Sequence, residues 1–357
     1  MGTLTANTTA SLSNLLPSFY DKVLLETFDK TVRFQQFAQN KSVPRDMGKS
    51  VTWNRATRLG LGYKLTEGTR PSSTALSTVQ ISALVEQYGQ YVALTDFIDL
   101  TSINDVTKMA VSRLGKSAGE TIDTVIQQAI IEHANLTAVS VNHYVKQSAQ
   151  QYFSTAQSAA QSVNANSLLA VSDINAITAK LRGYDVPGYD KSGSYVGIAS
   201  EEVLKGLRND STWQNWNQYT DSSPLFNGEI GKIHGVRLIN TTFGRVSAGS
   251  ANGGALSADT GISALAYATM IFGKDWFGAV DLGGKNVEII TSTQPTKEDP
   301  LNQLHTIGWK AFFSAKVLNV SAGVVVWSGN GETMAGASTA SARTAAGLRI
   351  LEPTTST

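Results

Sequence analysis

The chain has 357 residues, of which 41% are hydrophobic and only 16% are charged, against about 25% charged residues in a typical globular protein. Its 29 Lys and Arg and 28 Asp and Glu give a net charge of +1, which argues against a dedicated DNA-binding domain, because such a domain gains its affinity from phosphate contacts. Cysteine is absent, which excludes disulfides and cysteine metal sites. No signal peptide and no membrane-spanning segment are predicted, because the chain lacks a run of about 18 apolar residues.

The first 40 residues divide into a polar stretch and a predicted helix. Residues 1–18 are polar and show no period, whereas residues 19–40 carry apolar side chains at roughly helical spacing. These side chains are Tyr20, Val23, Leu24, Phe28, Val32 and Phe37. So narrow an apolar stripe cannot form a core by itself, and we expect this helix to lie across another surface.

Two predicted strands follow, separated by a long irregular segment. Apolar and polar residues alternate over residues 49–55 and again over residues 79–88. Residues 56–78 between them are rich in Gly, Pro, Ser and Thr. A loop of this length is uncommon in a compact domain unless it is functional or is bound by a partner. The pattern predicts a long protruding hairpin.

Residues 102–133 are predicted to form one long helix, the spine of the subunit. Ser102 and Asp105 resemble a capping box at its start, and Thr95 or Asp96 can begin a short helix before it. At about 1.5 Å per residue the spine would be about 48 Å long, so it needs neighbours along its length. Its expected apolar stripe consists of Ile103, Val106, Ala110, Leu114, Ala118, Ile122, Val125, Ala129 and His133.

The spine also carries two glycines. Gly115 and Gly119 each cost about 1 kcal/mol relative to Ala in a helix. Together with Ser112 and Ala118 they form a thin patch. Another backbone can approach the helix closely there, although tolerated exposed glycines would explain the same pattern.

A connector and a compact α/β region follow the spine. Residues 134–168 are rich in Gln, Ser and Ala and only weakly periodic, which indicates an insertion or connector. In residues 169–280 the pattern predicts a helix at 171–183 that begins at Ser172 or Asp173, a buried strand at 194–200 and a second helix directly after it.

Strands and a tail complete the chain. Residues 286–292 and 307–327 are long enough to be paired strands that close a sheet under the spine. Residues 329–357 consist mainly of Gly, Ala, Ser and Thr, the composition of a tail without its own core.

Catalytic motifs are absent from the pattern. The four histidines, His133, His143, His234 and His305, lack metal-type spacing. Gly60 and Gly62 do not continue into a dinucleotide fingerprint, and Glu201 and Glu202 are adjacent at a helix start and so point in different directions. The aromatic segment 213–226 is interpreted as a local core, with a ligand cage as the alternative. We therefore predict no catalytic, cofactor-binding or metal-binding residues and no enzyme.

The order of these elements resembles the major capsid proteins of tailed bacteriophages with the Hong Kong 97-type fold, and more specifically the phage N-four-type coat family. Seven segments carry the resemblance over residues 19–327: FYDKVLLE (19–26), KSVTWNR (49–55), LTEG (65–68), QYGQYVALTDFIDLTSIND (87–105), AGETID (118–123), GEIGKIHGVRLINT (228–241) and GWKAFFSAKVLN (308–319). Each is weak alone, and their common order makes them specific. Neither the connector nor the tail takes part.

The resemblance implies an α+β fold with an N-terminal arm, an extended hairpin loop, a spine helix, a peripheral domain and an axial α/β domain. The expected divisions are the arm (1–48), the hairpin (49–86), the peripheral domain with spine and connector (87–168), the axial domain (169–280), the closing strands of the peripheral domain (281–328) and the tail (329–357). The arm and the hairpin are expected to reach onto neighbouring subunits.

The resemblance also implies self-assembly into pentamers and hexamers of an icosahedral shell around double-stranded DNA, held without sequence specificity. The expected location is the virion, assembled in the cytoplasm of the bacterial host. Scaffolding, portal or decoration proteins are further expected partners. Two alternatives stay open: an encapsulin-type bacterial compartment, and a polysaccharide-binding or polysaccharide-cleaving phage or surface protein.

The charge pattern predicts contact residues between subunits. Residues 41–70 have a local charge of +5, and residues 96–133 a local charge of −3. Opposite charges on two patches would steer and register a head-to-tail contact. We expect the hairpin of one subunit to pack over the spine of the next; the alternative is a solvated loop that contacts nothing. The predicted contact residues are Arg55, Arg58, Lys64 and Arg70 on the hairpin and Asp105, Glu120 and Asp123 on the spine.

Overall fold

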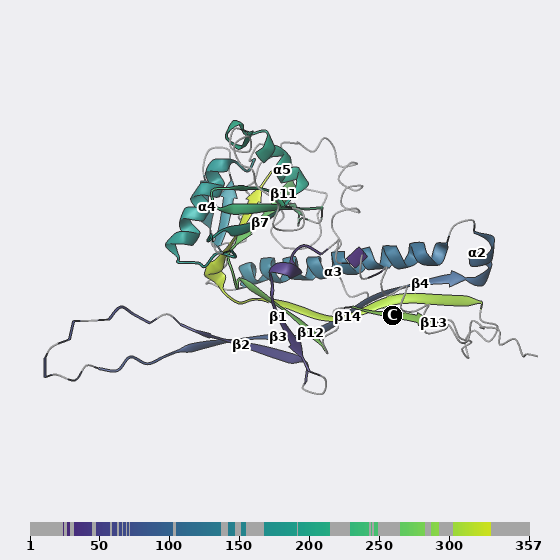
Figure 1. The fold of residues 1–357 in the computed structure, drawn as a ribbon, viewed down its shortest axis with the longest axis horizontal. Coiled ribbons are helices and arrows are strands. Elements are labelled where there is room, and N and C mark those ends of the chain that lie inside the picture. Colours follow the sequence, from purple (N-terminus) through teal and green to yellow (C-terminus); the bar gives the residue numbers. More distant parts are fainter. Residues whose placement is uncertain are drawn as a thin grey trace, which may run out of the picture.

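The computed structural model is elongated, with a hairpin projecting from one end and a long helix running toward the other (Figure 1). The structure describes residues 24, 27, 28, 32–44, 48–57, 59–62, 64, 65, 67, 68, 70, 72–102, 105–136, 142–146, 151–154, 168–190, 192–214, 229–242, 244, 246–248, 265–282, 287–292 and 303–329. The tail, most of the connector and the first 23 residues lie outside these ranges.

The long helix is α3 (Val106–Leu136), so the predicted spine is confirmed with shifted ends. Asp105 Oδ1 accepts a hydrogen bond from the Lys108 backbone N–H at 2.8 Å, and Asp105 is therefore the residue that caps the helix. Ser102 is instead the C-cap of the short helix α2 (Asp96–Thr101). The prediction that Thr95 or Asp96 begins a short helix is confirmed, because Thr95 Oγ1 accepts from the Ile98 N–H.

The buried face of α3 follows the predicted stripe only in its middle. Leu114, Ala118, Ile122 and Val125 are buried as expected, whereas Val106, Ala110 and Ala129 are only partly buried. A steady spacing of four residues drifts around a helix of 3.6 residues per turn. The observed buried face therefore takes in other positions: Val111, Ile126, Ile130 and Ile131.

A five-stranded sheet packs against α3. Its longest strand, β14 (Leu304–Val317), lies against the helix and alternates between buried and partly exposed residues. Around it are β4 (Glu86–Thr95), β12 (Phe277–Leu282), β13 (Glu288–Ser292) and β1 (Gln39–Val43), the last parallel to β12. The prediction that β13 and β14 pair under the spine is confirmed.

The second sheet forms an α/β unit on the same side of the five-stranded sheet as α3 (Figure 1). Helices α4 (Val171–Gly183) and α5 (Glu201–Arg208) belong to this unit. Among the described residues the sheet has eight strands: β6 (Gln151–Ser154), β5 (Asn142–Lys146), β15 (Gly323–Ser328), β11 (Leu265–Phe272), β7 (Tyr195–Ser200), β9 (Val236–Thr241), β8 (Glu229–Ile233) and β10 (Val246–Ala248), which pairs with β11.

Three parts of the strand prediction are corrected by this topology. Strand β15, expected under the spine, lies between β11 and β5 in the eight-stranded sheet. All six of its residues are buried, and a strand that is apolar on both faces needs a central position covered on both sides. Strand β12, expected in the α/β unit, pairs with β14. The connector is not a plain insertion, since it supplies β5 and β6.

The predicted hairpin is confirmed: β2 (Ser50–Ala56) pairs antiparallel with β3 (Thr78–Leu84). Its base is attached to the five-stranded sheet through a small cluster made of Val43, Trp53, Ala83, Val280 and Leu318. The Trp53 ring lies where a Cβ on Gly278 would stand, 2.6 Å from Cζ2. Only glycine at position 278 therefore lets the hairpin base pack this closely.

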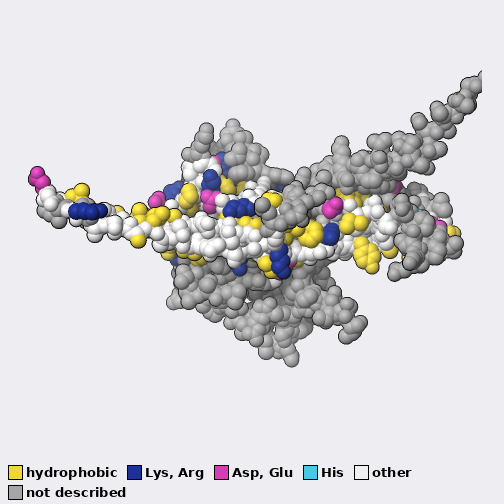
Figure 2. Space-filling view, turned by 90° about the horizontal axis from the view of Figure 1, so that it is seen from below, with side chains coloured by type: hydrophobic (Ala, Val, Ile, Leu, Met, Phe, Trp, Pro, Cys, Tyr) yellow, Lys and Arg dark blue, Asp and Glu magenta, His cyan; other side chains and the backbone are white. Residues whose placement is uncertain are grey.

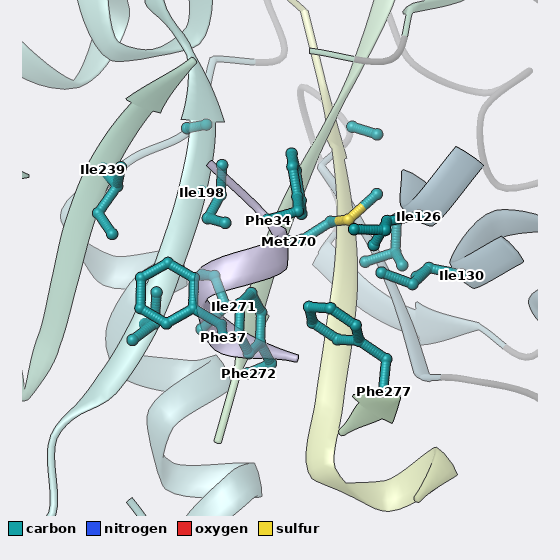
Figure 3. Packing of buried hydrophobic residues seen from close by; sticks show 14 of the residues in the cluster. Phe34, Phe37, Ile126, Ile130, Ile198, Ile239, Met270, Ile271, Phe272 and Phe277 are labelled. Atoms are coloured by element: carbon teal, nitrogen blue, oxygen red, sulfur yellow. The ribbon is translucent and has the colours of Figure 1, made fainter. Parts of the chain in front are cut away.

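The predicted helix over residues 19–40 is wrong at its C-terminal end. Leu24, Thr27 and Phe28 are helical, but the chain then makes a 3-10 turn, η1 (Gln35–Phe37), and enters β1. Phe34 and Phe37 of this segment lie between the α/β unit and the spine (Figure 3). The expectation that the segment lies across another surface is confirmed for these residues, and the surface belongs to their own chain.

Candidate inter-subunit surfaces

The hairpin beyond its base has no core of its own. The Thr57 N–H donates to the Ser77 carbonyl at 2.9 Å, so the two arms stay side by side just beyond the strands. The described residues farther out are exposed. An isolated two-stranded hairpin is marginally stable in water, so contact with another surface would stabilise this projection.

The hairpin carries exposed leucines that are not among the predicted contact residues, all of which are charged. Leu61 is 93% exposed, far more than a leucine in a folded core. Other large apolar side chains that are exposed among the described residues of the hairpin are Leu59, Leu65, Leu76, Val79 and Leu84. The signal was the spacing of leucines at 59, 61 and 65 within a segment that has no strand or helix period. Clustered apolar side chains of this kind mark interaction surfaces.

The predicted basic residues of the hairpin are on its surface. Arg55, Lys64 and Arg70 are exposed, whereas Arg58 lies outside the described residues. Basic and hydrophobic side chains are interspersed along the hairpin, which lies at the left in Figure 2. The hairpin therefore offers both apolar and positively charged groups to a partner.

The predicted acidic partner on the spine is largely engaged within its own chain. Asp105 caps α3, and Glu120 forms an ion pair with Lys116 at 3.7 Å. Asp123 is only 1% exposed, so it cannot contact another subunit in this conformation. On the same helix Lys108, Arg113 and Lys116 are exposed. The described surface of the spine is thus more basic than the sequence count suggested.

Asp123 binds the N-terminal segment of its own chain. Its two carboxylate oxygens accept hydrogen bonds from the backbone N–H groups of Arg33, at 2.8 Å, and Phe34, at 3.1 Å. Burial raises the pKa of Asp123 to about 7, although these hydrogen bonds and the Arg33 charge act in the opposite direction.

Gly115 on α3 permits the close backbone approach that was predicted. A Cβ at this position would lie 2.8 Å from the Leu24 carbonyl oxygen. The approaching backbone therefore belongs to the N-terminal segment of the same chain. Gly119 is buried.

The opposite end of the molecule carries a second group of exposed apolar side chains. Phe97 of α2 is 72% exposed. Tyr91 of β4, Ile98 of α2, Met109 at the start of α3 and Leu304 of β14 are each close to half exposed or more. The hairpin and this α2 end lie at the two ends of the long axis in Figure 1. Two different patches at opposite ends are what a head-to-tail contact requires.

A polar cluster stabilises the α/β unit. Arg237 pairs with Glu229 at 2.8 Å and with Asp190 at 3.3 Å. Although burial acts to raise it, the pKa of Asp190 lies well below its usual value, because the Ser194 N–H, the Ser192 and Ser194 hydroxyls and Arg237 hydrogen-bond to its carboxylate. These residues connect parts of the α/β unit within one chain. Their charges pair with one another, so no ligand is needed to account for the cluster.

Metal-ligand clusters and membrane-spanning helices are not found in the part of the chain that the structure describes. No group of three or more His, Asp or Glu side chains could hold a metal ion there. His234 occupies the turn between β8 and β9 at a φ of 48°. Trp213 of the aromatic segment is buried in the main core, and its other aromatics lie outside the described residues. None of the described helices is both long and apolar enough to cross a bilayer.

Comparison with known proteins gives structural relatives. Neither a family model nor a curated protein sequence matches the chain. Among solved structures it is similar to the capsid of cyanophage Pam1, with a TM-score of 0.58 and 14% identity over 85% of this chain and 92% of that one. It is similar to the capsid of cyanophage P-SCSP1u, with a TM-score of 0.57 and 14% identity over 84% of this chain and 89% of that one. It is also similar to the capsid of Ralstonia phage GP4, with a TM-score of 0.56 and 13% identity over 84% of this chain and 91% of that one. The chain thus has the Hong Kong 97-type capsid fold, as its sequence motifs indicated.

Proposed function

We propose that this chain is a major capsid protein that self-assembles into the icosahedral shell enclosing the double-stranded DNA of a tailed bacteriophage. The observation that carries this proposal is the match of more than four-fifths of the chain to phage capsid subunits. An identity of 13–14% establishes a fold and leaves the function to experiment. The location would be the virion, after assembly from pentamers and hexamers in the bacterial cytoplasm.

The surfaces of the subunit support a shell role. A hairpin with exposed leucines and basic side chains leaves one end, and the exposed apolar side chains near Phe97 lie at the other. We propose that the hairpin tip of one copy contacts the α2 end of the next copy. Such a head-to-tail contact generates a ring when the rotation closes.

This contact revises the expected one between opposite charges. Within their own chain, Asp105 caps α3, Glu120 pairs with Lys116 and Asp123 is buried. Apolar contact would supply the affinity, at roughly 25 cal/mol per Å² of apolar surface removed from water. The basic groups Arg55, Lys64 and Arg70, together with Arg58, would tune encounter and register.

The near-neutral charge of the chain fits a container. A net charge of +1 allows DNA to be enclosed without tight binding, since each phosphate contact adds affinity. Portal, scaffolding and decoration proteins are proposed as further partners of the assembled shell.

The proposal is tested by expressing the full chain alone and separating the product by size-exclusion chromatography and electron microscopy. A shell protein forms closed particles or capsomers of megadalton mass. A polysaccharide-binding or polysaccharide-cleaving protein would form small oligomers, which would overturn the proposal. Particles purified from the native host distinguish the compartment alternative, because an encapsulin-type shell would contain protein cargo in place of DNA.

A further inference from the structure

The first half of α3 has an exposed basic face. Lys108, Arg113 and Lys116 are exposed on this half, which lies between α2 and the α/β unit in Figure 1. In the second half of the helix Ile126 and Ile130 are instead buried against the α/β unit (Figure 3). The positive charges of the spine are therefore concentrated on the part of the helix that the α/β unit does not cover.

These basic side chains line a groove. It is open to solvent, has a volume of about 390 Å³ and is bordered by Thr27 of the N-terminal segment. Lys108, Arg113 and Lys116 line it together with Met109, which is 55% exposed. At about 1.5 Å per residue, Lys108 and Lys116 are about 12 Å apart along the helix. The groove thus offers three cations to a ligand within a short distance.

Acidic groups do not cancel the charge of this groove. Its lining residues carry three positive charges and one negative charge, that of Asp105, which leaves +2. Asp105 accepts the Lys108 N–H at 2.8 Å and caps the helix. Glu120 pairs with Lys116 at 3.7 Å, but the Lys116 side chain is 55% exposed. Arg113 makes no ion pair with the described residues. The groove therefore favours an anionic ligand.

We propose that this groove binds phosphate groups of double-stranded DNA and that Lys108, Arg113 and Lys116 are the contact residues. The identity of the partner rests on the proposed function, since a shell around a genome has DNA along its inner wall. A duplex carries one negative charge per about 1.7 Å of its axis, so a stretch of about 12 Å presents enough phosphates for three cations. Lys and Arg donate charge-assisted hydrogen bonds to phosphate oxygens, and such contacts read no base sequence.

The lining of the groove favours DNA over an acidic protein segment. Among the described lining residues Met109 alone is apolar, whereas the centre of a protein–protein interface is rich in apolar side chains. Phosphate binding needs charge and hydrogen-bond donors, which the groove supplies. Three contacts also give only weak binding, in keeping with a chain whose net charge is +1.

The salt dependence of DNA binding tests the proposal. Fluorescence anisotropy of a labelled duplex of about 30 base pairs measures the affinity of the full-length chain between about 50 and 200 mM salt. Each lost phosphate contact should reduce the slope of log affinity against log salt concentration by about 0.9. The triple variant Lys108→Gln, Arg113→Gln and Lys116→Gln should therefore lose about 2.7 from the wild-type slope. Lys274→Gln, at an exposed lysine outside α3, is the control and should keep that slope.

The fold of each variant is checked by its melting temperature. The three substituted side chains are exposed, so the triple variant should melt as the wild type does. If it fails to fold, Arg113→Gln alone decides the question through a slope change of about 0.9. A slope equal to that of the wild type in the folded variant would overturn the proposal.

Poly-L-glutamate is the second probe. It should displace the duplex from the wild-type chain poorly at equal charge concentration. Efficient displacement would show that an acidic protein segment is the better ligand and would overturn the proposal. Electron microscopy of the same wild-type chain separates this result from the proposed function. Shells together with an unchanged slope in the triple variant would remove the DNA contact and leave the shell role. A reduced slope without shells would support the groove and contradict the shell role.

Discussion

The eight-stranded sheet and the β2–β3 hairpin differ in where their apolar side chains find contact. In β7 and β15 every residue is buried, and the neighbouring strands and helices of the same chain cover both faces. In β3 Ala83 alone is buried, and the leucines beyond the strands face water. In the described residues the apolar side chains of this sheet are buried within one chain, whereas we propose that those of the hairpin contact another copy. Substitutions in the two regions should accordingly separate stability from assembly.

The largest expected effect is in the core of the sheet. Ile271 of β11 is fully buried between β7 and β15. Ile271→Ala should lower the free energy of unfolding by about 2–5 kcal/mol, because it removes buried methylene groups and leaves a cavity. Denaturant unfolding of the unassembled chain measures this loss. A loss below about 1 kcal/mol would mean that this strand is less tightly packed than described.

The next effect concerns the contact between the N-terminal segment at Leu24 and the spine at Gly115. Gly115→Ala places a Cβ 2.8 Å from the Leu24 carbonyl oxygen, so the backbone must shift, at about 1–3 kcal/mol. This cost should exceed the gain of about 1 kcal/mol in helix propensity, and the melting temperature should fall. Gly183→Ala in α4 is the control, since nothing lies within 4 Å of its Cβ. Equal melting temperatures for the two variants would contradict the close approach.

Substitutions in the hairpin should leave stability nearly unchanged. Leu61→Ser with Leu65→Ser alters two exposed side chains, so the free energy of unfolding should change by no more than about 0.5 kcal/mol. Particle formation should nevertheless be lost, because the apolar contact with the next copy is removed. Tyr184→Ser, at an exposed residue near the end of α4, should assemble as the wild type does. Normal assembly of the leucine variant would exclude the leucines from the contact.

The smallest effect is expected from the charges. Reversal of Arg55, Lys64 and Arg70 to Glu should slow assembly by about tenfold at low salt, with less effect at high salt where these charges are screened. Light scattering at a series of salt concentrations follows the rate. Lys274→Glu, at an exposed lysine outside the hairpin, serves as the control. An unchanged rate and salt dependence would show that the basic groups take no part.

Sequence periodicity predicted the helices and strands that are determined by the local residue pattern. The spine, its preceding short helix, the hairpin strands and α4 follow from alternation and helical spacing. The predicted start of α4 at Ser172 or Asp173 is wrong: the helix begins at Val171 with Ala170 as its N-cap, and Asp173 accepts the Ala170 N–H from within the first turn. Strand β15 was assigned to the wrong sheet, because an apolar run specifies burial without specifying its neighbours.

The predicted contact residues were limited in the same way, because residue types do not specify which distant groups a side chain contacts. Arg55, Lys64 and Arg70 lie on the surface as expected, since nothing in the described chain covers an extended hairpin. Asp123 was counted as a surface charge, but backbone N–H groups from residues 33 and 34 bury it. A carboxylate that binds distant main-chain groups leaves no trace in the residue types around it. The leucines at 59, 61 and 65 lie in a segment without a strand or helix period, and this position is the sequence signal for their exposure.

The most direct test of the central claim is a cryo-EM map of the particles formed by the full-length chain. The account predicts a closed shell in which the density of each hairpin tip lies on the α2 end of a neighbouring copy, with Leu61 facing the region of Phe97. A hairpin folded back onto its own subunit, or a product without closed shells, would contradict it.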